Sequence, residues 1–554
     1  MYSLALASES GKSAPTLIDI LSYNRDSRSD QAAYIFRDHR GDEQSLSWRE
    51  LWDSAEIAAA GIVALFGTGG KLMLVVDPGL EFVELFFAVG LSGNIPVPMS
   101  TRFGSGSKER IGLVCLQAGI DGLIFDNVNS EFVTNALNEV GISHSLNTSS
   151  TCALRETHLE HNLPVPATDA FIQYTSGSTG APKGLAISHT NLIRNLSLMA
   201  KICEANQGES SVSWLPPHHD FGLIGGILFP AFLGGTGILF APSSFVRRPK
   251  TWLELITRYR AAFTGAPNFG FDLAVRRVTD KSGLDLSSLR AAINGAERID
   301  PDTLRKFDES FAEVGLSPGA VRPCFGLAEA TLLVTGTTSR PWKSILVTRS
   351  GLERGLLERV ECEKKSSADV ELVANGPPVV EHLKIFDDGK ELDDGIIGEV
   401  WIADPCVSAT APRIETTSAV TLAQDISWIA TGDLGALLDG ELFIAGRKKE
   451  LVIRSGTNVY LDDVDVFIAE TVPNIGTQNV CSFRLADSEE IAVAIELRGS
   501  IEDSAKLRSD ILGAFLAVFG FTPQLISFVP IGTIPRTTSG KKQRDACARL
   551  LASY

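Results

Sequence analysis

Residues 174–184 read YTSGSTGAPKG, a run in which hydroxyl side chains and glycines surround one lysine. Glycine lets the backbone approach a ligand closely, and hydroxyls with backbone N–H groups suit the oxygens of a phosphate chain. The run differs from the common P-loop, which has Gly directly before its Lys and Ser or Thr directly after it. Here Pro182 precedes Lys183 and Gly184 follows it. The sequence therefore predicts either a phosphate-binding loop of another kind or a solvated turn between a strand and a helix.

The segments around this run alternate between strand and helix patterns. Short apolar runs typical of buried strands are 71–77, 93–100, 122–127, 170–176 and 237–242. Helical patterns between them are 81–92 and 190–203. Strands that alternate with helices pack into α/β layers whose sheets are largely parallel. We therefore predict an α/β fold.

A second region begins near GRKKELVIRSG (446–456). It contains strand patterns at 480–484 and 490–497, a helical pattern at 502–519 and a basic segment at 539–550. This length is enough for a small domain. We predict a large N-terminal domain, 1–448, of layered, largely parallel sheets and helices, followed by a small mobile α+β C-terminal domain, 449–554.

The composition excludes several classes of protein. The 554 residues carry a net charge of −17, whereas nucleic acids and anionic membrane surfaces attract basic patches. Eight cysteines are scattered without a CxxC pair, which indicates free thiols in the reducing cytoplasm. The N-terminus lacks the basic start of a signal peptide. The uncharged stretch 221–242 is long enough to span a bilayer, but its glycines and Pro230 favour a buried helix, a turn and a strand.

Polar clusters follow the apolar runs, where open α/β sheets place their ligands. They are YTSGSTGAPKG (174–184), WLPPHHDFGLIGG (214–226), INGAERI (293–299), CFGLAEAT (324–331), WIATGDLG (428–435), GRKKELVIRSGTNVY (446–460) and IPRTTSGKKQR (534–544). In this order the clusters resemble those of the acyl-adenylate-forming superfamily, over about residues 16–550. The residue sequences of several clusters are most similar to those of the fatty acyl-AMP ligases. The charged stretch 346–373 also resembles an insertion that is typical of this subfamily.

The resemblance implies a site for ATP. The phosphate loop would hold the β- and γ-phosphates through Thr175, Ser176, Ser178, Thr179 and Lys183. The purine would lie between Phe325, with Gly326 beside it, and the segment Asn294, Gly295, Ala296 and Glu297, which would line its other side mostly by backbone. Phe325 stands where the family commonly has Tyr. Asp433 would accept both ribose hydroxyls, with Arg447 assisting, and Glu329 would ligate Mg²⁺, a hard ion that prefers oxygen ligands.

The resemblance also assigns the chemistry. Lys541 would reach the acyl-phosphate oxygens that form when a carboxylate attacks ATP, where a fixed cation lowers an electrostatic barrier. Lys449 would be the hinge about which the small domain swings. His219 would gate the carboxylate end of the acyl tunnel, with a structural histidine as the alternative. His218 and His219 are adjacent and do not converge on one metal ion.

The implied reaction converts a fatty acid and ATP to acyl-AMP and pyrophosphate, and then passes the acyl group to the phosphopantetheine thiol of an acyl carrier protein. Because no carrier domain follows position 554, we expect the carrier to act in trans. Rival functions are an acyl-CoA ligase, an adenylating enzyme for aryl or amino acids, and a non-catalytic nucleotide-binding protein.

An acidic carrier needs a basic docking patch on this acidic chain. Two clusters could supply it: Arg247, Arg248 and Lys250, or the terminal Lys542, Arg544 and Arg549. After PCVS (405–408) the chain lacks the Gly-Tyr-Trp-like turn of the family, so substrate contacts there are not carried over.

Overall fold

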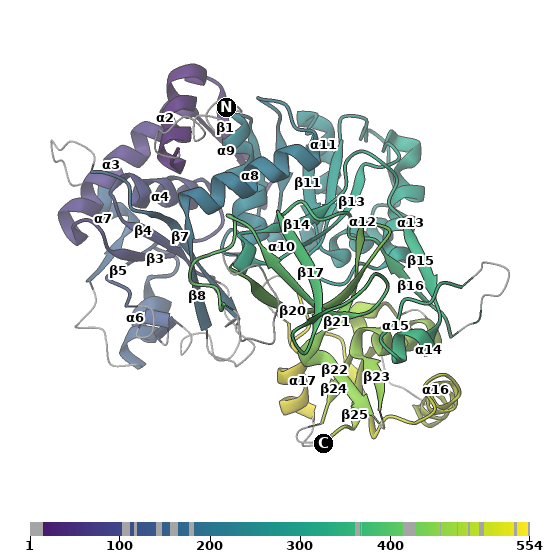
Figure 1. Cartoon of the computed structure of the whole chain (residues 1–554). Helices are drawn as coiled ribbons and strands as arrows, with labels where there is room; N and C mark the ends of the chain where they lie inside the picture. The colour runs from purple at the N-terminus through teal and green to yellow at the C-terminus, as the bar shows by residue number, and fades with distance from the viewer. Residues whose placement is uncertain are drawn as a thin grey trace. The chain divides into compact units, whose positions relative to one another are not determined.

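The computed structural model describes residues 15–101, 111–112, 114–115, 119–139, 147–155, 164–176, 182–360, 366, 368–413, 427–454, 456–473, 475–485, 488–497, 504–536 and 540–551. They fall into two compact units (Figure 1). The first unit comprises Met1–Ala296, Leu304–Pro341 and Asp404–Pro412. The second unit comprises Glu297–Thr303, Trp342–Ala403 and Arg413–Tyr554.

The first unit contains an eight-stranded sheet. Its strands are β1 (Ala32–Arg37), β2 (Glu43–Ser47), β9 (Ser211–Ser213), β10 (Gly237–Phe240), β11 (Phe263–Ala266), β12 (Ala291–Asn294), β13 (Val321–Gly326) and β14 (Leu333–Gly336). The spatial order is β14-β13-β12-β11-β9-β10-β1-β2. The strands from β13 to β1 run parallel, and β14 and β2 are antiparallel edges. The carboxyl ends of the central strands therefore lie along one edge.

Helices surround the strands of this unit. Up to residue 341 they are α2 (Leu17–Arg28), α3 (Trp48–Phe66), α4 (Leu80–Leu91), α6 (Ser130–Glu139), α7 (Thr151–Arg155), α8 (His189–Cys203), α9 (Phe229–Leu233), α10 (Pro242–Arg247), α11 (Lys250–Tyr259), α12 (Asn268–Arg277) and α13 (Pro301–Phe311), with 3₁₀ turns η3 (Ala312–Val314) and η4 (Ala328–Ala330). Both helices expected from the sequence are present, as α4 and α8. Ser188 and Asn191 cap α8 reciprocally, which fixes its first turn.

A second sheet of the first unit has four parallel strands in the order β4-β3-β5-β6. These are β3 (Lys71–Val75), β4 (Ile95–Pro98), β5 (Gly122–Phe125) and β6 (Asn147–Ser150). The last four residues of β3, LMLV, are all buried, as a strand covered on both faces requires. The predicted strands at 71–77, 93–100 and 122–127 are confirmed here, and the one at 237–242 is confirmed as β10.

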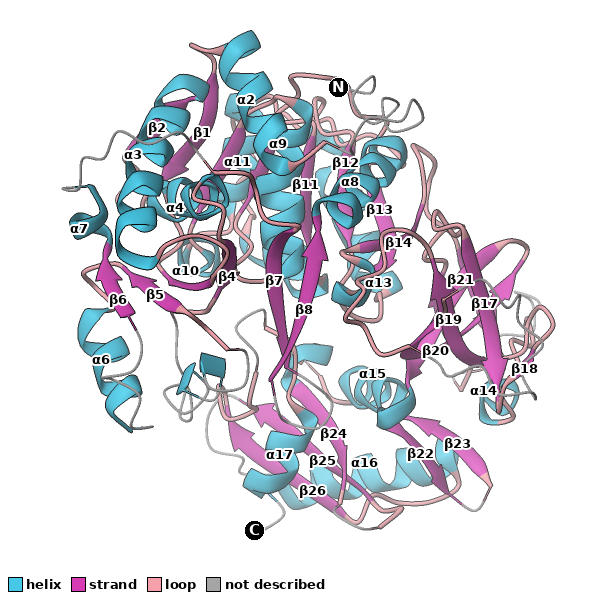
Figure 2. Ribbon diagram, turned by 60° about the vertical axis from the view of Figure 1, so that its left-hand side comes forward, coloured by secondary structure: helices cyan, strands magenta, loops and turns pink. Residues whose placement is uncertain are grey.

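The strand predicted at 170–176 exists but does not join a parallel sheet. It is β7 (Asp169–Ser176), and it pairs antiparallel with β8 (Pro182–Ser188), the two long strands at the centre of Figure 2. The phosphate loop therefore connects two strands, and the alternative of a turn between a strand and a helix is wrong. A continuous apolar run fits either pairing, so the sequence pattern did not distinguish them.

The uncharged stretch 221–242 folds as a buried helix, a turn and β10, as predicted. It begins as a π-helix, η2 (Phe221–Leu228), which continues directly into α9. In the part of the chain that the structure describes, no helix combines the length and apolarity needed to cross a membrane.

The second unit consists mostly of antiparallel strands. Its larger sheet has the order β18-β17-β19-β20-β21, and β15 pairs with β16. The strands are β15 (Ser344–Val347), β16 (Val370–Val373), β17 (His382–Asp387), β18 (Lys390–Glu391), β19 (Gly398–Ala403), β20 (Ile429–Leu438) and β21 (Glu441–Arg447), with α14 (Arg349–Glu353) between β15 and β16. The predicted insertion, 346–373, thus contains the end of β15, α14 and all of β16. Residues 361–365 and 367 lie outside the described residues.

The C-terminal residues add a small α+β layer to this unit. It comprises η6 (Lys448–Glu450), β22 (Leu451–Arg454), β23 (Thr457–Tyr460), α15 (Leu461–Thr471), η7 (Thr477–Asn479), β24 (Val480–Arg484), β25 (Ile491–Leu497), α16 (Ser504–Phe519), β26 (Leu525–Pro530) and α17 (Arg544–Leu551). The expected strands and helix are confirmed as β24, β25 and α16. The basic segment at 539–550 becomes largely the helix α17.

The predicted α/β fold with a large and a small part is confirmed. The predicted domain boundary between residues 448 and 449 stays a prediction. The two compact units do not divide the chain there, because 342–403 and 413–554 belong to the same unit. All seven described cysteines are free thiols.

Candidate active site

The hairpin of β7 and β8 carries the predicted phosphate loop. Thr175 pairs in register with Lys183, so the two arms of the loop begin directly opposite each other. Lys183 is exposed on β8. Ser176 ends β7, whereas Ser178 and Thr179 lie outside the described residues. The hairpin thus presents a mobile cationic side chain at the base of a loop rich in hydroxyl groups.

Glycine is required directly after that lysine. A Cβ on Gly184 would lie 2.8 Å from ring atoms of Tyr174, which packs across the hairpin. Burial also raises the pKa of Tyr174 above its usual value, so its hydroxyl stays protonated at neutral pH. The close ring packing explains Gly184 in the motif independently of any ligand.

Ser408 connects the hairpin to the segment of Glu329, a role that the sequence did not reveal. The Ser408 hydroxyl donates to the Ala186 carbonyl on β8 at 2.8 Å, and the Ser408 amide donates to the Glu329 carbonyl at 2.8 Å. Thr410 accepts the Ala186 amide at 2.9 Å. PCVS stood out in the sequence only as a departure from the family pattern. These bonds hold the lysine strand and the predicted magnesium ligand on one framework.

Glu329 lies in the 3₁₀ turn η4, directly after β13. Its side chain is half-buried and makes no hydrogen bond or ion pair within the described ranges. A carboxylate that is accessible and has no protein partner fits a ligand of a hard divalent cation, which takes few protein oxygens when phosphates supply the rest.

The predicted purine-binding residues follow two adjacent parallel strands. Asn294 ends β12 and pairs in register with Pro323 of β13, and Phe325 lies two residues further along β13. The side chain of Asn294 is fully buried, yet neither its amide nitrogen nor its oxygen has a hydrogen-bond partner among the described residues. Its polar atoms have no exposed surface through which a ligand could be reached, so a purine contact by this segment would involve its backbone.

The backbone beside these strands is constrained. Ala296 has a φ of +75°, a conformation that L residues seldom adopt and that accumulates at ligand sites. A Cβ on Gly295 would lie 3.1 Å from the Cys324 carbonyl oxygen, and one on Gly326 would lie 2.0 Å from the Leu332 carbonyl oxygen. The two glycines therefore allow close packing of these turns. Glu297 begins the segment of the second unit that follows.

In the second unit, Asp433 and Arg447 face each other on adjacent strands. They are register partners on β20 and β21, and the Arg447 Nε lies 3.2 Å from an Asp433 carboxylate oxygen. Asp433 is buried, and Arg447 is about half exposed. Asp433 lies within the strand β20, so its side-chain direction is set by the sheet. The pair that the sequence predicted as a ribose contact is therefore assembled.

The remaining predicted residues of this unit, Lys449 and Lys541, lie in a short 3₁₀ turn and in a loop. Lys449 is exposed in η6, between β21 and β22. Lys541 is half-buried and follows Gly540, which has a φ of +87°. Thr537 of the same motif lies outside the described residues.

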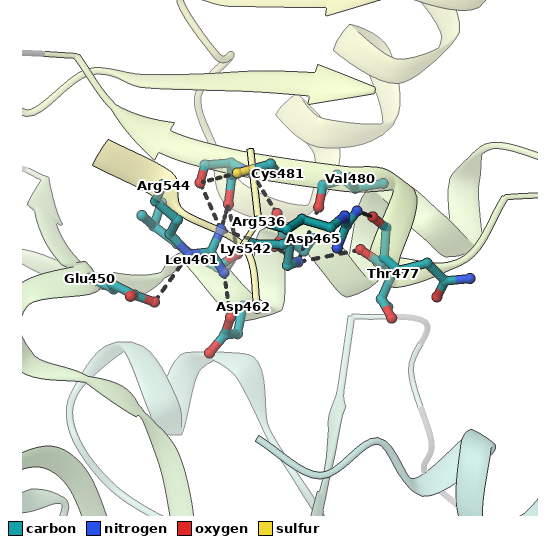
Figure 3. Close-up of polar contacts among 12 residues, drawn as sticks. Glu450, Leu461, Asp462, Asp465, Thr477, Val480, Cys481, Arg536, Lys542 and Arg544 are labelled. Carbon is teal, nitrogen blue, oxygen red and sulfur yellow. Dashed lines mark hydrogen bonds and ion pairs between the residues drawn. The ribbon is translucent and has the colours of Figure 1, made fainter. Parts of the chain in front are cut away.

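The cations directly after Lys541 are buried in a charged cluster, shown in Figure 3. Arg544 is 7% exposed and contacts Glu450, Asp462 and Asp465, and Lys542 contacts Asp465. The prediction of a terminal basic docking patch is wrong for both residues, because Arg544 is buried and the ammonium of Lys542, 18% exposed, is already paired with Asp465. Arg549 is exposed on α17.

The adjacent histidines His218 and His219 lie next to the hairpin strand β7. The rings of His218 and His219 lie 4.7 Å apart, just before the π-helix η2. Over the described ranges, no group of three potential ligands converges on a metal position. Gln173 of β7 donates to the His218 carbonyl at 2.7 Å, which holds this turn against the hairpin strand.

Comparison with known proteins agrees with these features. The model of the AMP-binding enzyme family matches residues 22–410. The long-chain-fatty-acid–AMP ligase FadD26 of Mycobacterium marinum is 34% identical, over 97% of this chain and 96% of that protein. The 4-hydroxyphenylalkanoate adenylyltransferase of Mycobacterium tuberculosis is 33% identical, over 96% and 91%. A solved structure from work on fatty acyl-adenylate ligases of E. coli and L. pneumophila has a TM-score of 0.86 at 29% identity, covering 98% of this chain and 99% of that one.

The chain therefore belongs to the AMP-binding enzyme family. Its relatives include fatty acyl-AMP ligases, as the sequence motifs predicted.

Proposed function

We propose that this protein is an ATP- and Mg²⁺-dependent ligase that activates a long-chain fatty acid. The acid carboxylate attacks the α-phosphate of ATP, a P–O bond to the acid forms, and the bond to pyrophosphate breaks. The products are acyl-AMP and pyrophosphate. The observation that carries this proposal is the buried Asp433 carboxylate beside Arg447, an acceptor for the two ribose hydroxyls.

Other groups would bind and orient ATP. Lys183 and the hydroxyls of its loop would hold the β- and γ-phosphates, as mobile charge and as donors. The segment 294–297 would line the purine mostly through its backbone, and Phe325 would stack on the ring. Glu329 would hold Mg²⁺, which when bound neutralises charge on the phosphates.

Lys541 would act on the reacting atoms. The attack brings a carboxylate toward a polyphosphate, so the barrier is largely electrostatic. A fixed ammonium near the acyl-phosphate oxygens stabilises the charge that develops there, an effect worth about 10²–10³ in rate for comparable donors. If Lys541 and the phosphate loop belong to separately moving parts, a closure about Lys449 precedes chemistry.

In a second step the acyl group would pass to the phosphopantetheine thiol of a carrier protein in the cytoplasm, with AMP leaving. Of the two basic clusters considered for docking, the remaining one is Arg247, Arg248 and Lys250. Arg247 is exposed, whereas Arg248 and Lys250 pair with Glu254 and Asp280, each at 2.7 Å. Charge reversal at Arg247 should slow transfer and leave adenylation unchanged, whereas unchanged transfer would contradict docking on this cluster.

A second candidate substrate is an aryl-substituted alkanoic acid. It is favoured by the similarity to the hydroxyphenylalkanoate adenylyltransferase, which is 33% identical. The first half-reaction would be the same, and only the acid that the protein selects would differ.

The test is pyrophosphate release, measured with ATP, Mg²⁺ and either a long-chain fatty acid or a 4-hydroxyphenylalkanoic acid. We expect release that requires the acid, and a loss of about 10²–10³-fold in Lys541→Ala while ATP binding, measured by calorimetry, persists. The exposed Arg549→Ala is the matched cation control. Wild-type turnover in Lys541→Ala would remove Lys541 from the mechanism, and the absence of release with either acid would contradict the proposed function.

A further inference from the structure

Lys542, the neighbour of the proposed catalytic lysine, is held from three directions. Its ammonium contacts the Asp465 carboxylate on α15, the Val480 carbonyl at 3.0 Å and the Thr477 carbonyl at 3.3 Å (Figure 3). The side chain is 18% exposed. An ammonium has three N–H donors, and here each has an acceptor. The geometry fixes the position of residue 542 relative to α15, η7 and β24.

Arg544 secures the same segment two residues later. Its guanidinium lies 2.9 Å from Asp465, so Lys542 and Arg544 share one buried carboxylate. It also donates to the Ser482 carbonyl at 2.7 Å on β24. Asp465 is 2% exposed and accepts the Ser482 amide with its other oxygen at 2.6 Å. Buried charges of this kind tolerate little displacement, because any movement leaves a charge unpaired.

The chain closes into a loop around Lys541. Arg536 and Lys542 form an antiparallel bridge, and the Gln543 amide donates to the Pro535 carbonyl at 2.9 Å. The Arg536 guanidinium also donates to the Gly540 carbonyl at 3.3 Å. Lys541 thus lies between a glycine bound by Arg536 and a lysine bound by α15.

We propose that Lys542 is a positioning residue for Lys541: its buried contacts with Asp465 and two carbonyls fix the backbone from which the catalytic ammonium extends. The inference rests on the proposed function of Lys541. Electrostatic stabilisation of the reacting atoms depends on a preorganised cation, and a misplacement of about 1 Å costs about 100-fold in rate.

The test compares Lys542→Met with Lys542→Arg and with the exposed control Arg549→Met. Initial rates of acyl-AMP formation are measured over ranges of ATP and fatty acid. We expect Lys542→Met to lower kcat about 100-fold with both KM values within about twofold of wild type, because substrate binding uses other residues. Lys542→Arg keeps a cation beside Asp465 and should recover much of kcat. Arg549→Met should match wild type.

A second reaction separates positioning from a loss of folding. Transfer of the acyl group from synthetic acyl-AMP to a thiol acceptor does not include the adenylation step, so Lys542→Met should retain it. A kcat at the wild-type level, or an equal fall in both reactions with no recovery in Lys542→Arg, would overturn the inference.

If Lys542→Met does not fold, Arg536→Gln provides the same test from the other side of the loop. Its side chain is 28% exposed, so the substitution removes less buried charge. A fall in kcat alone is expected, and an unchanged kcat would overturn the inference. Lys541→Ala distinguishes a failure of the positioning role of Lys542 from a failure of the catalytic role of Lys541. If that variant is inactive while Lys542→Met is fully active, only the positioning role fails, whereas an active Lys541→Ala removes the proposed role of Lys541 and this inference with it.

Discussion

The two lysines proposed for the reaction lie on segments that are held by different kinds of interaction. The strand of Lys183 is connected to Ser408 and Thr410 by neutral hydrogen bonds. The segment of Lys541 is flanked by Lys542 and Arg544, whose charges are buried against carboxylates. Neutral hydrogen bonds contribute about 0.5–1.5 kcal/mol each, whereas the loss of one partner from a buried ion pair costs about 3–5 kcal/mol.

The difference matches the proposed roles. A cation that binds the outer phosphates of ATP can adjust its position to the ligand. Lys183 can do so because its side chain is exposed. A cation that stabilises a developing charge must be in place before the reaction, and rigid ion pairs beside Lys541 provide this. The comparison predicts that substitutions near Lys541 destabilise their surroundings more than substitutions near Lys183.

The largest effect on stability should come from Arg544→Met. It leaves Glu450 and Asp462 without their buried partner, and Asp462 is strongly affected: burial opposes its ionisation, but Arg544, Lys542 and Arg298 outweigh burial and lower its pKa. We expect the local free energy of unfolding around α15 and α17 to fall by about 3–5 kcal/mol. Hydrogen exchange of these helices measures it. Arg549→Met, on the exposed face of α17, should change it by less than about 0.5 kcal/mol, and an equally small change in Arg544→Met would contradict the comparison.

An intermediate effect should come from pH at the start of α8, directly after the Lys183 strand. Burial lowers the pKa of His189 to about 4, and its Nδ1 accepts the Leu17 amide at 3.0 Å. In the unfolded chain its pKa is about 6.5, so between pH 6.5 and 4 the unfolded state binds the additional proton. The neutral, buried His189 therefore contributes to the free energy of unfolding in full above pH 6.5. This contribution, about 3 kcal/mol in all, is lost as the pH falls toward 4.

Thermal unfolding between pH 7.5 and pH 5 measures this effect. The wild-type midpoint should fall more steeply with acidification than that of His189→Asn. The exposed His39→Asn should keep the wild-type slope. Parallel slopes for wild type and His189→Asn would show that the stability does not depend on a neutral His189.

The smallest effect should come from Ser408→Ala, which removes the hydroxyl that bonds the Ala186 carbonyl. We expect a loss of about 1 kcal/mol in the local stability of β8, read from hydrogen exchange of that strand. Ser197→Ala is the control, because the Ser197 hydroxyl bonds a carbonyl of its own helix at 2.8 Å. A loss above about 3 kcal/mol would remove the contrast with Arg544→Met.

Sequence patterns predicted the elements better than their pairing. The run at 480–484 coincides with β24, because short apolar runs in buried strands have clear ends. The pairing of β7 with β8 was not predicted, since it depends on the antiparallel partner that follows the loop. The ribose pair was named from motifs alone, and only the structure places Asp433 and Arg447 in register.

The burial of Lys542 and Arg544 was missed for a physical reason. Charged side chains near a chain end are usually solvated, and the acidic partners of these two lie far away in sequence, on η6 and α15. Asp462 and Asp465 stand three positions apart and so share one face of that helix. The first five residues of that helix contain three acids, Asp462, Asp463 and Asp465, of which the last two are buried, and such a group needs cationic partners.

The central claim, ligation of a fatty acid to AMP, is tested most directly by mass spectrometry of the products. The protein is incubated with ATP, Mg²⁺, a mixture of medium- and long-chain fatty acids, coenzyme A and a holo carrier protein. We expect acyl-AMP and acyl-carrier without acyl-CoA. Abundant acyl-CoA would make the protein an acyl-CoA ligase instead, and the absence of any acyl-AMP would show that the protein does not activate fatty acids in this way.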